Sequence, residues 1–424
     1  MKVLKWLGVG IAGVVLLLVA VAMALQYWLR TDDFRTRVEQ QASAALGVPL
    51  KLGKLSIDLW PLPAVAVDDV EIHTRPLLTV GRLEARPAYA ALANGKLEIA
   101  TLVVRKAVLP QTALAAIGAA MQKKPAAKTK AKAPPSSSSG SAMDLLPRRM
   151  VFDDITWVDE KGQRVTADAE ADLGHDGLLD AASFKIVQGR LSGTHGKIHR
   201  EGDDWPLRVD IGGGSIAGRL QLRPGKGNAQ VLSGTLTTQN VEVSALTAPS
   251  KPLTGKLEAQ TTLRSEFREP GQLADAMNTQ TRFTVRDGLV QGLDLAKAVQ
   301  TVGLSRGGIT RIDTLTGQVA TQGKVVHLTN LVATSGALSA TGNVSISAAK
   351  ALSGVVNVDI SRTKGTLGVP LDVGGTVDEP SVMLTRGAMV GAALGTLVAP
   401  GPGTAAGAGA GGKIGESLRN FFSK

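Results

Sequence analysis

Two histidines, His195 and His199, have a spacing close to that of many metal ligands. The surrounding segment, GTHGKIHREG, is typical of a strand followed by a turn. On a strand, residues four positions apart are separated by about 13 Å, which is too far for both to bind one zinc ion. We therefore predict no metal site at this pair.

Three pairs of adjacent acids are further candidates for chemistry, as a general acid with a general base. They are Asp68-Asp69, Asp153-Asp154 and Asp203-Asp204. Neighbours on a strand point to opposite faces, so we predict turn and surface positions for these acids. The run from Gly212 to Gly214 lacks the strand, loop and lysine context of a phosphate loop and predicts a turn. The sequence also lacks a Gly-x-Ser-x-Gly motif, and we predict that the protein is not an enzyme and has no cofactor.

Apolar and polar residues alternate in several segments, and this period predicts strands with one apolar face. Between Lys256 and Glu266, for example, Leu257 and Leu263 are an even number of positions apart and so lie on one face of a strand, whereas Arg264 lies on the other face. Aromatic residues make up only 3% of the chain, which has 49 glycines, so we expect many short strands with small inward side chains. The residues predicted to line an apolar face are Leu257, Leu263, Phe283, Val285, Val356, Val358 and Ile360.

The first 30 residues predict a transmembrane anchor. The run from Trp6 to Leu29 has no charged residue, and as a helix it would be roughly 36 Å long, enough to cross a bilayer core of about 30 Å. Lys2 and Lys5 precede it, so the amino terminus is predicted to be cytoplasmic and the rest of the chain to lie outside the cytoplasm. The alternative is a signal peptide cleaved after the sequence Ala-Met-Ala at 22–24.

The formal net charge of +11 comes in part from one stretch, Met121 to Ser141, in which lysines alternate with Pro, Ala and Ser. Such a composition cannot bury enough apolar surface to fold, so we predict a disordered linker at 119–143. The remaining positive charge is spread thinly, and we predict no binding to nucleic acid. The alternative role for these lysines is attraction to anionic lipid headgroups.

Two regions of structure flank this linker. Residues 31–118 are predicted to begin with a helix, which Thr31 or Asp32 caps and Gly47 ends, and to continue as strands. Residues 144–385 are predicted to contain most of the strands.

The tail, 386–424, is rich in glycine. Gly387, Gly391 and Gly395 recur at a spacing of four, which lets helices approach one another closely. We expect the tail to contact the membrane or a second copy of the chain through short helices. The alternative is a flexible tail without a partner.

The order of these features resembles that of the bacterial AsmA family. An anchor and a short helix are followed by ALGVPLKLGKLSIDLWPLPAVAVDDVEIH and GRLEARPAYAALANGKLEIATLVVRKAVLP. Further on, FTVRDGLVQGLDLAKAV resembles a family element in which a strand turns at Asp287-Gly288 and leads into a helix. The segments LTGQVATQGKVVHLTNLVATSGALSATGNVSI and GVPLDVGGTVDEPSV also resemble the carboxy-terminal part of these proteins.

The resemblance implies a mainly β fold: an elongated, twisted and curved antiparallel sheet that forms an apolar groove, with a few short helices, similar to chorein-type lipid transfer proteins. It implies a single-pass protein of the bacterial inner membrane, most of which lies in the periplasm. There it would bind or transfer phospholipid or another acyl lipid and support outer-membrane assembly and envelope lipid homeostasis. The alternative is a structural scaffold with a closed β-sandwich that contacts outer-membrane assembly proteins.

Overall fold

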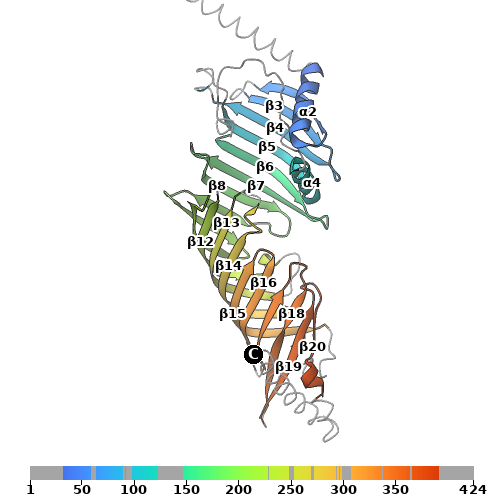
Figure 1. Cartoon of the computed structure of the whole chain (residues 1–424), viewed down its shortest axis with the longest axis vertical. Coiled ribbons are helices and arrows are strands. Elements are labelled where there is room, and N and C mark those ends of the chain that lie inside the picture. The colour runs from blue at the N-terminus through green and yellow to red at the C-terminus, as the bar shows by residue number, and fades with distance from the viewer. Residues whose placement is uncertain are drawn as a thin grey trace, which may run out of the picture. The chain divides into compact units, whose positions relative to one another are not determined.

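A computed structural model of the chain describes residues 32–58, 64–88, 91, 98–122, 147–227, 229–247, 253–268, 272–292, 294–295, 297, 307–336, 338–362 and 365–390. The chain divides into two compact units, Met1–Gly193 and Thr194–Lys424. Figure 1 shows the first in blue to green and the second in green to red. Each unit contains one sheet, and we describe each by itself.

The first unit consists of two helices and eight strands among its described residues. They are α2 (Asp32–Leu46), β1 (Leu50–Lys51), β2 (Leu55–Asp58), β3 (Ala64–Ile72), β4 (Leu78–Pro87), β5 (Ile99–Pro110), α4 (Gln111–Gln122), β6 (Arg149–Val158), β7 (Arg164–Leu173) and β8 (Leu179–Gln188).

Strands β1 and β2 both pair with β3, and from β3 to β8 each strand pairs with the next. All these pairs are antiparallel except β5 with β6, which is parallel. A parallel pair needs a crossover connection, and α4 begins this one directly after β5. Neither β1 nor β2 pairs with β8, so the sheet does not close on itself.

The two helices of this unit lie side by side, and α4 also packs against β5 (Figure 1). The end of α2 is as predicted: Gly47 has a φ of +73° and its N–H donates to the carbonyl of Ser43 at 2.9 Å. Helix α4 was not predicted from the sequence. Its segment, QTALAAIGAAMQ, has high helix propensity because it is rich in alanine.

The second unit consists of twelve strands and one short helix among its described residues. They are β9 (His195–His199), β10 (Asp204–Ile211), β11 (Gly214–Pro224), β12 (Gln230–Glu242), α5 (Val243–Leu246), β13 (Leu253–Phe267), β14 (Met277–Gln291), β15 (Ile309–Gln322), β16 (Val325–Ser335), β17 (Leu338–Ile346), β18 (Leu352–Arg362), β19 (Gly365–Gly375) and β20 (Pro380–Leu384).

From β9 to β20 each strand pairs antiparallel with the next, so this sheet is a simple meander. Strand β9 does not pair with β20, so the described strands form an open sheet. The predicted mainly β fold with an open antiparallel sheet and a few short helices is confirmed. The closed sandwich that we considered as the alternative is not formed within either unit.

A line of β-bulges crosses the first sheet. Asp69 in β3, Lys106 in β5 and Asp154 in β6 have φ angles of 50°, 53° and 57°, and each falls at a break in the regular pairing. The N–H of Asp154 donates to a carboxylate oxygen of Asp168 at 2.9 Å. Each bulge adds one residue to its strand and increases the local twist.

One such bulge corrects a prediction from the sequence. We expected a turn at Asp287-Gly288, but β14 continues through both residues to Gln291. Asp287 has a φ of 52° and lies opposite the break in the pairing at Gly255, where φ is 120°. Asp and Gly tolerate positive φ in bulges as well as in turns, so this dipeptide does not distinguish the two.

The division between the units lies at Gly193, within the region predicted as 144–385. Strands β6, β7 and β8, which follow the predicted linker at 119–143, belong to the first unit because β6 pairs with β5. The helix α4 extends through Gln122, so residues 119–122 are helical. Residues 123–143 of the predicted linker lie outside the described residues.

The predicted anchor, 1–30, and the tail beyond residue 390 also lie outside the described residues. In the part of the chain that the structure does describe, no helix combines the length and the apolar character needed to cross a membrane.

The core of the second unit lies toward its carboxy-terminal end. It consists of small and medium apolar side chains that pack together: Leu295, Ile312, Ala333, Ala340, Val358, Val369, Leu371, Val382, Leu384 and Ala388. Val358 and Leu371 are completely buried.

Candidate functional site

Two neighbouring rows of apolar side chains cross the first sheet from β2 to β8. Within each row, the residues are direct partners on successive strands. One row consists of Leu55, Val67, Leu83, Val104, Phe152, Ala169 and Phe184. The other consists of Ile57, Val65, Ala85, Leu102, Met150, Ala171 and Ala182. We call these two rows the first apolar face; neither contains a polar or charged residue.

Much of the first apolar face is in contact with solvent. Val65 is 42% exposed and Phe184 is 37% exposed, and most of the other residues are half-buried. After the bulges in β3 and β5, the next residues of these strands, Val70 and Ala107, are buried. Ala113 of α4 is also buried. A continuous apolar surface that is left partly open to water is typical of a binding surface rather than of a core.

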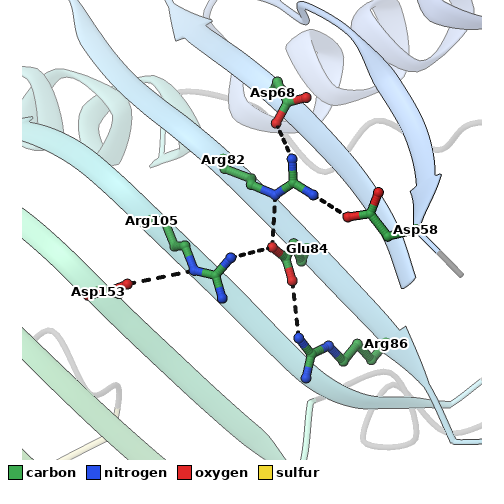
Figure 2. Close-up of polar contacts among 7 residues, drawn as sticks. All are labelled: Asp58, Asp68, Arg82, Glu84, Arg86, Arg105 and Asp153. Carbon is green, nitrogen blue, oxygen red and sulfur yellow. Dashed lines mark hydrogen bonds and ion pairs between the residues drawn. The ribbon is translucent and has the colours of Figure 1, made fainter. Parts of the chain in front are cut away.

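The opposite face of the same strands carries an ion-pair network (Figure 2). The network is formed by Asp58, Asp68, Arg82, Glu84, Arg86, Arg105 and Asp153. The guanidinium of Arg82 binds Asp58, and it donates to Asp68 and Glu84 at 2.8 Å each. These side chains alternate along the strands with residues of the first apolar face, so the network and the apolar rows lie on opposite sides of the sheet.

Glu84 lies at the centre of this network with only 5% of its surface exposed. Its carboxylate accepts hydrogen bonds from Arg105 at 2.7 Å and from Arg86 at 3.3 Å, in addition to that from Arg82. Burial alone would raise the pKa of Glu84, but the hydrogen bonds and positive charges of the three arginines outweigh it, so the pKa lies below its ordinary value. The hydrogen bond between Arg82 and Glu84 also raises the pKa of Arg82. The network therefore balances four carboxylates with three guanidinium groups.

The second sheet also has a continuous uncharged face. One row crosses it from β9 to β20 and consists of Ile198, Leu207, Gly218, Leu236, Thr261, Thr281, Val319, Leu328, Val344, Gly354, Val373 and Val382. A second row consists of Val241, Leu257, Val285, Leu315, Ala333, Ala340, Val358 and Val369. We call the side of the sheet that bears these rows the second apolar face.

The structure brings the predicted apolar residues together on this face. Leu257, Val285 and Val358 belong to one row, and Leu263 and Phe283 have the same parity as Leu257 and Val285 on β13 and β14. Val356 is the partner of Gly342 and Leu371 on the neighbouring strands. In β18, the backbone of Ile360 pairs with Leu338 and Leu367.

These residues differ in how accessible they are. Leu257, Leu263, Phe283 and Val356 are half-buried, whereas Val285 is 2% exposed and Val358 is completely buried. Val358 belongs to the carboxy-terminal cluster, and Val285 is buried outside that cluster. Alternation along a strand identifies the face of a side chain but not what covers that face.

Two threonine hydroxyls within the second apolar face satisfy one another. The Oγ1 atoms of Thr261 and Thr281, on adjacent strands, are 2.9 Å apart. One hydroxyl donates to the other, so this hydrogen bond satisfies one donor and one acceptor on an otherwise apolar face.

The first apolar face was not predicted from the sequence. The signal was present, because Val65 and Val67 alternate with Ala66 and Asp68, and Leu102 and Val104 follow the same period. Only the register of seven strands aligns these short alternations into continuous rows.

The predicted strand at His195 and His199 is confirmed, since both lie in β9. Each histidine contacts a different carboxylate: His195 lies 3.2 Å from Asp210 and His199 lies 2.8 Å from Glu201. Within the described ranges, no three His, Asp or Glu side chains come together in a way that would hold a metal ion.

Comparison with known families gives one match, in the first unit. Residues 1–193 match the family model of the AsmA family, and this match confirms the family resemblance for that part of the chain. The matched range ends where the first unit ends, so the unit that carries the first apolar face and the ion-pair network is an AsmA-family region. No curated protein and no solved structure matches the chain. The resemblance of the motifs beyond residue 193 stays a prediction.

Proposed function

We propose that this chain binds acyl lipid on its apolar faces and supports lipid homeostasis and assembly of the bacterial outer membrane, without covalent chemistry. The bound ligand would be a phospholipid or another lipid with similar chains. In this proposal the amino-terminal segment anchors the protein in the inner membrane, and both units lie in the periplasm.

The observation that carries the proposal is the first apolar face. Two rows without any polar group extend over seven strands, and residues such as Val65 and Phe184 remain accessible. Each methylene of an acyl chain that leaves water for such a surface contributes roughly 0.8 kcal/mol. A surface of this kind would bind many chains with little regard to their length or saturation, because the hydrophobic effect has no direction.

The AsmA-family match of the same unit supports an envelope role. Transfer of lipid between membranes and contact with outer-membrane assembly proteins are further parts of the proposal. The structure of the two faces is compatible with holding lipid and with passing it to a partner.

A matched pair of variants on β8 tests lipid binding. Phe184 belongs to the first apolar face, whereas Ser183 points to the other side of the same strand, and both are exposed. We expect Phe184→Arg to reduce the lipid that co-purifies with residues 31–424 expressed without detergent, because the new charge would have to be buried against acyl chains. Ser183→Arg adds the same charge on the other face and should leave the lipid unchanged.

The lipid would be extracted and quantified by mass spectrometry relative to protein. Thermal unfolding of both variants checks that neither has lost its fold. Absence of co-purified lipid from the wild type, or an equal loss in the two variants, would reject the assignment of lipid to this face.

A further inference from the structure

The polar side of the second sheet has a hollow of about 540 Å³ that spans β12 to β16. Two adjacent rows of outward side chains border it. One row consists of Thr237, Gln260, Arg282, Gln318 and Thr329, and the other consists of Thr235, Thr262, Gln280 and Ala320. The backbone of the row between them, which includes Thr261 and Thr281, forms its floor, because the side chains of that row point to the second apolar face. We call this hollow the polar trough.

Neutral hydrogen-bonding groups dominate the polar trough. Apart from Arg282 and Ala320, its two rows contain only threonines and glutamines. Within the described part of the chain, the side-chain amides of Gln260, Gln280 and Gln318 make no hydrogen bond to protein. These amides each offer donors and an acceptor to a ligand.

Arg282 is the one charged side chain of the polar trough. It is exposed, and among the described residues no carboxylate forms an ion pair with it. By contrast, Arg286 on the same strand pairs with Glu258 at 2.7 Å. An unpaired guanidinium among neutral amides is suited to bind a carboxylate or phosphate in a bidentate geometry.

These features exclude several classes of ligand. Nucleic acid requires many cations along a phosphate backbone, and the polar trough has one. Stable protein interfaces are centred on aromatic, Met or Arg anchors in apolar surroundings. Arg282 of the polar trough lies instead among amides and hydroxyls, and the two rows contain no aromatic residue or methionine. An acyl chain would leave the amides and hydroxyls without partners.

We propose that the polar trough binds an acidic oligosaccharide. The hydroxyl groups of the sugars exchange hydrogen bonds with the glutamines and threonines, and an acidic group of one sugar binds Arg282. Five strands at about 4.8 Å spacing give the trough a length of roughly 19 Å, which accommodates a short oligosaccharide. This site lies on the opposite side of the sheet from the second apolar face and does not depend on lipid binding.

The test uses the full chain in detergent micelles and two soluble probes of equal length, tetragalacturonate and maltotetraose. Binding is measured by isothermal titration calorimetry. Tetragalacturonate should bind the wild type, and Arg282→Gln should weaken this binding about tenfold or more, as expected for loss of a hydrogen bond to a charged group. Gln260→Ala should weaken it in the same direction. Maltotetraose should bind more weakly than tetragalacturonate.

Arg264→Gln is the matched control, because Arg264 is exposed on the same side of β13 but lies outside the polar trough. It should change the affinity less than twofold, and all variants should unfold at the same temperature as the wild type. No saturable binding of tetragalacturonate, equal affinity for both probes, or equal weakening by Arg264→Gln and Arg282→Gln would each overturn the proposal.

Discussion

The carboxylate of Glu84 accepts a hydrogen bond of 2.8 Å from the Nε–H of Arg82, two residues earlier on the same strand. The residue between them, Leu83, points to the other side of the sheet and belongs to the first apolar face. The two polar side chains thus satisfy one another on one side of the strand, and Leu83 contributes an uncharged surface on the other. The network joins side chains of β2, β3, β4, β5 and β6, which carry much of the candidate lipid site.

This relationship predicts how stability depends on pH. The pKa of Glu84 is lower in the folded chain than in the unfolded chain, so its contribution to stability is complete above the unfolded pKa and is lost as the pH falls through the folded pKa. We expect Glu84→Gln to lower the free energy of unfolding by about 1–3 kcal/mol at neutral pH, and by less in acid. Urea unfolding at a series of pH values measures both effects.

Glu170→Gln provides the matched control for this prediction. Glu170 also accepts from an arginine, Arg149, at 2.7 Å, but both side chains are about half exposed. Exposed pairs contribute only about 0–1 kcal/mol, so this variant should be close to the wild type. If the two variants lost the same stability, the buried position of Glu84 would have no special role.

A second prediction separates the two sides of the second sheet. Leu263→Arg places a charge on the second apolar face and should reduce bound lipid, whereas Arg264→Glu changes an outward side chain and should not. Val285→Arg should instead destabilise the unit, since Val285 is 2% exposed. Lipid mass spectrometry combined with thermal unfolding distinguishes these outcomes, and equal lipid loss in the first two variants would show that the faces are misassigned.

A third prediction concerns the core of the second unit. Leu371 is completely buried in the carboxy-terminal cluster, so Leu371→Ala should cost about 2–5 kcal/mol. Met383 on the neighbouring strand is 62% exposed, and Met383→Ala should change stability by no more than about 0.5 kcal/mol. Chemical denaturation measures both. A small loss for Leu371→Ala would mean that this cluster is not the core of the unit.

A fourth prediction concerns the segment 123–146. It completes the crossover from the end of β5 to the start of β6, and Pro110 and Thr101 pair with Val158 and Arg149 in parallel. Because β6 runs parallel to β5, the chain must go back along the length of β5 before β6 begins. This distance is roughly 30 Å, and at least about nine extended residues are needed to span it if α4 contributes nothing. Removing residues 126–137 should therefore leave the melting temperature nearly unchanged, and removing 124–145 should lower it strongly. Equal melting temperatures for both deletions would contradict the parallel pairing.

Much of the fold follows from local signals in the sequence. The helix that ends at Gly47, the strand from Ala64 to Ile72 and the alternation at Leu257 and Leu263 are local patterns, and the structure agrees with each. The parallel pairing of β5 with β6 is a relation between distant segments, and no local pattern predicts it. For the same reason the division at residue 193 was missed.

The candidate site was predictable only in part. Parity placed Leu263 and Val285 on one face correctly, but it did not reveal that Val285 is buried and Leu263 accessible. The first apolar face was missed because its rows depend on the register of seven strands. The Asp-Gly pair at 287–288 was misinterpreted as a turn because the same backbone angles occur in a bulge.

Site-specific photo-crosslinking in cells tests the central claim most directly. A benzophenone amino acid is introduced at Phe184 or at Ser183 of the full chain, and crosslinked lipid is detected by mass spectrometry after irradiation. The two positions are adjacent on β8 but lie on opposite sides of the sheet. We predict lipid adducts at position 184 and none above background at position 183. Adducts at neither position, or at both to the same extent, would contradict lipid binding on the first apolar face.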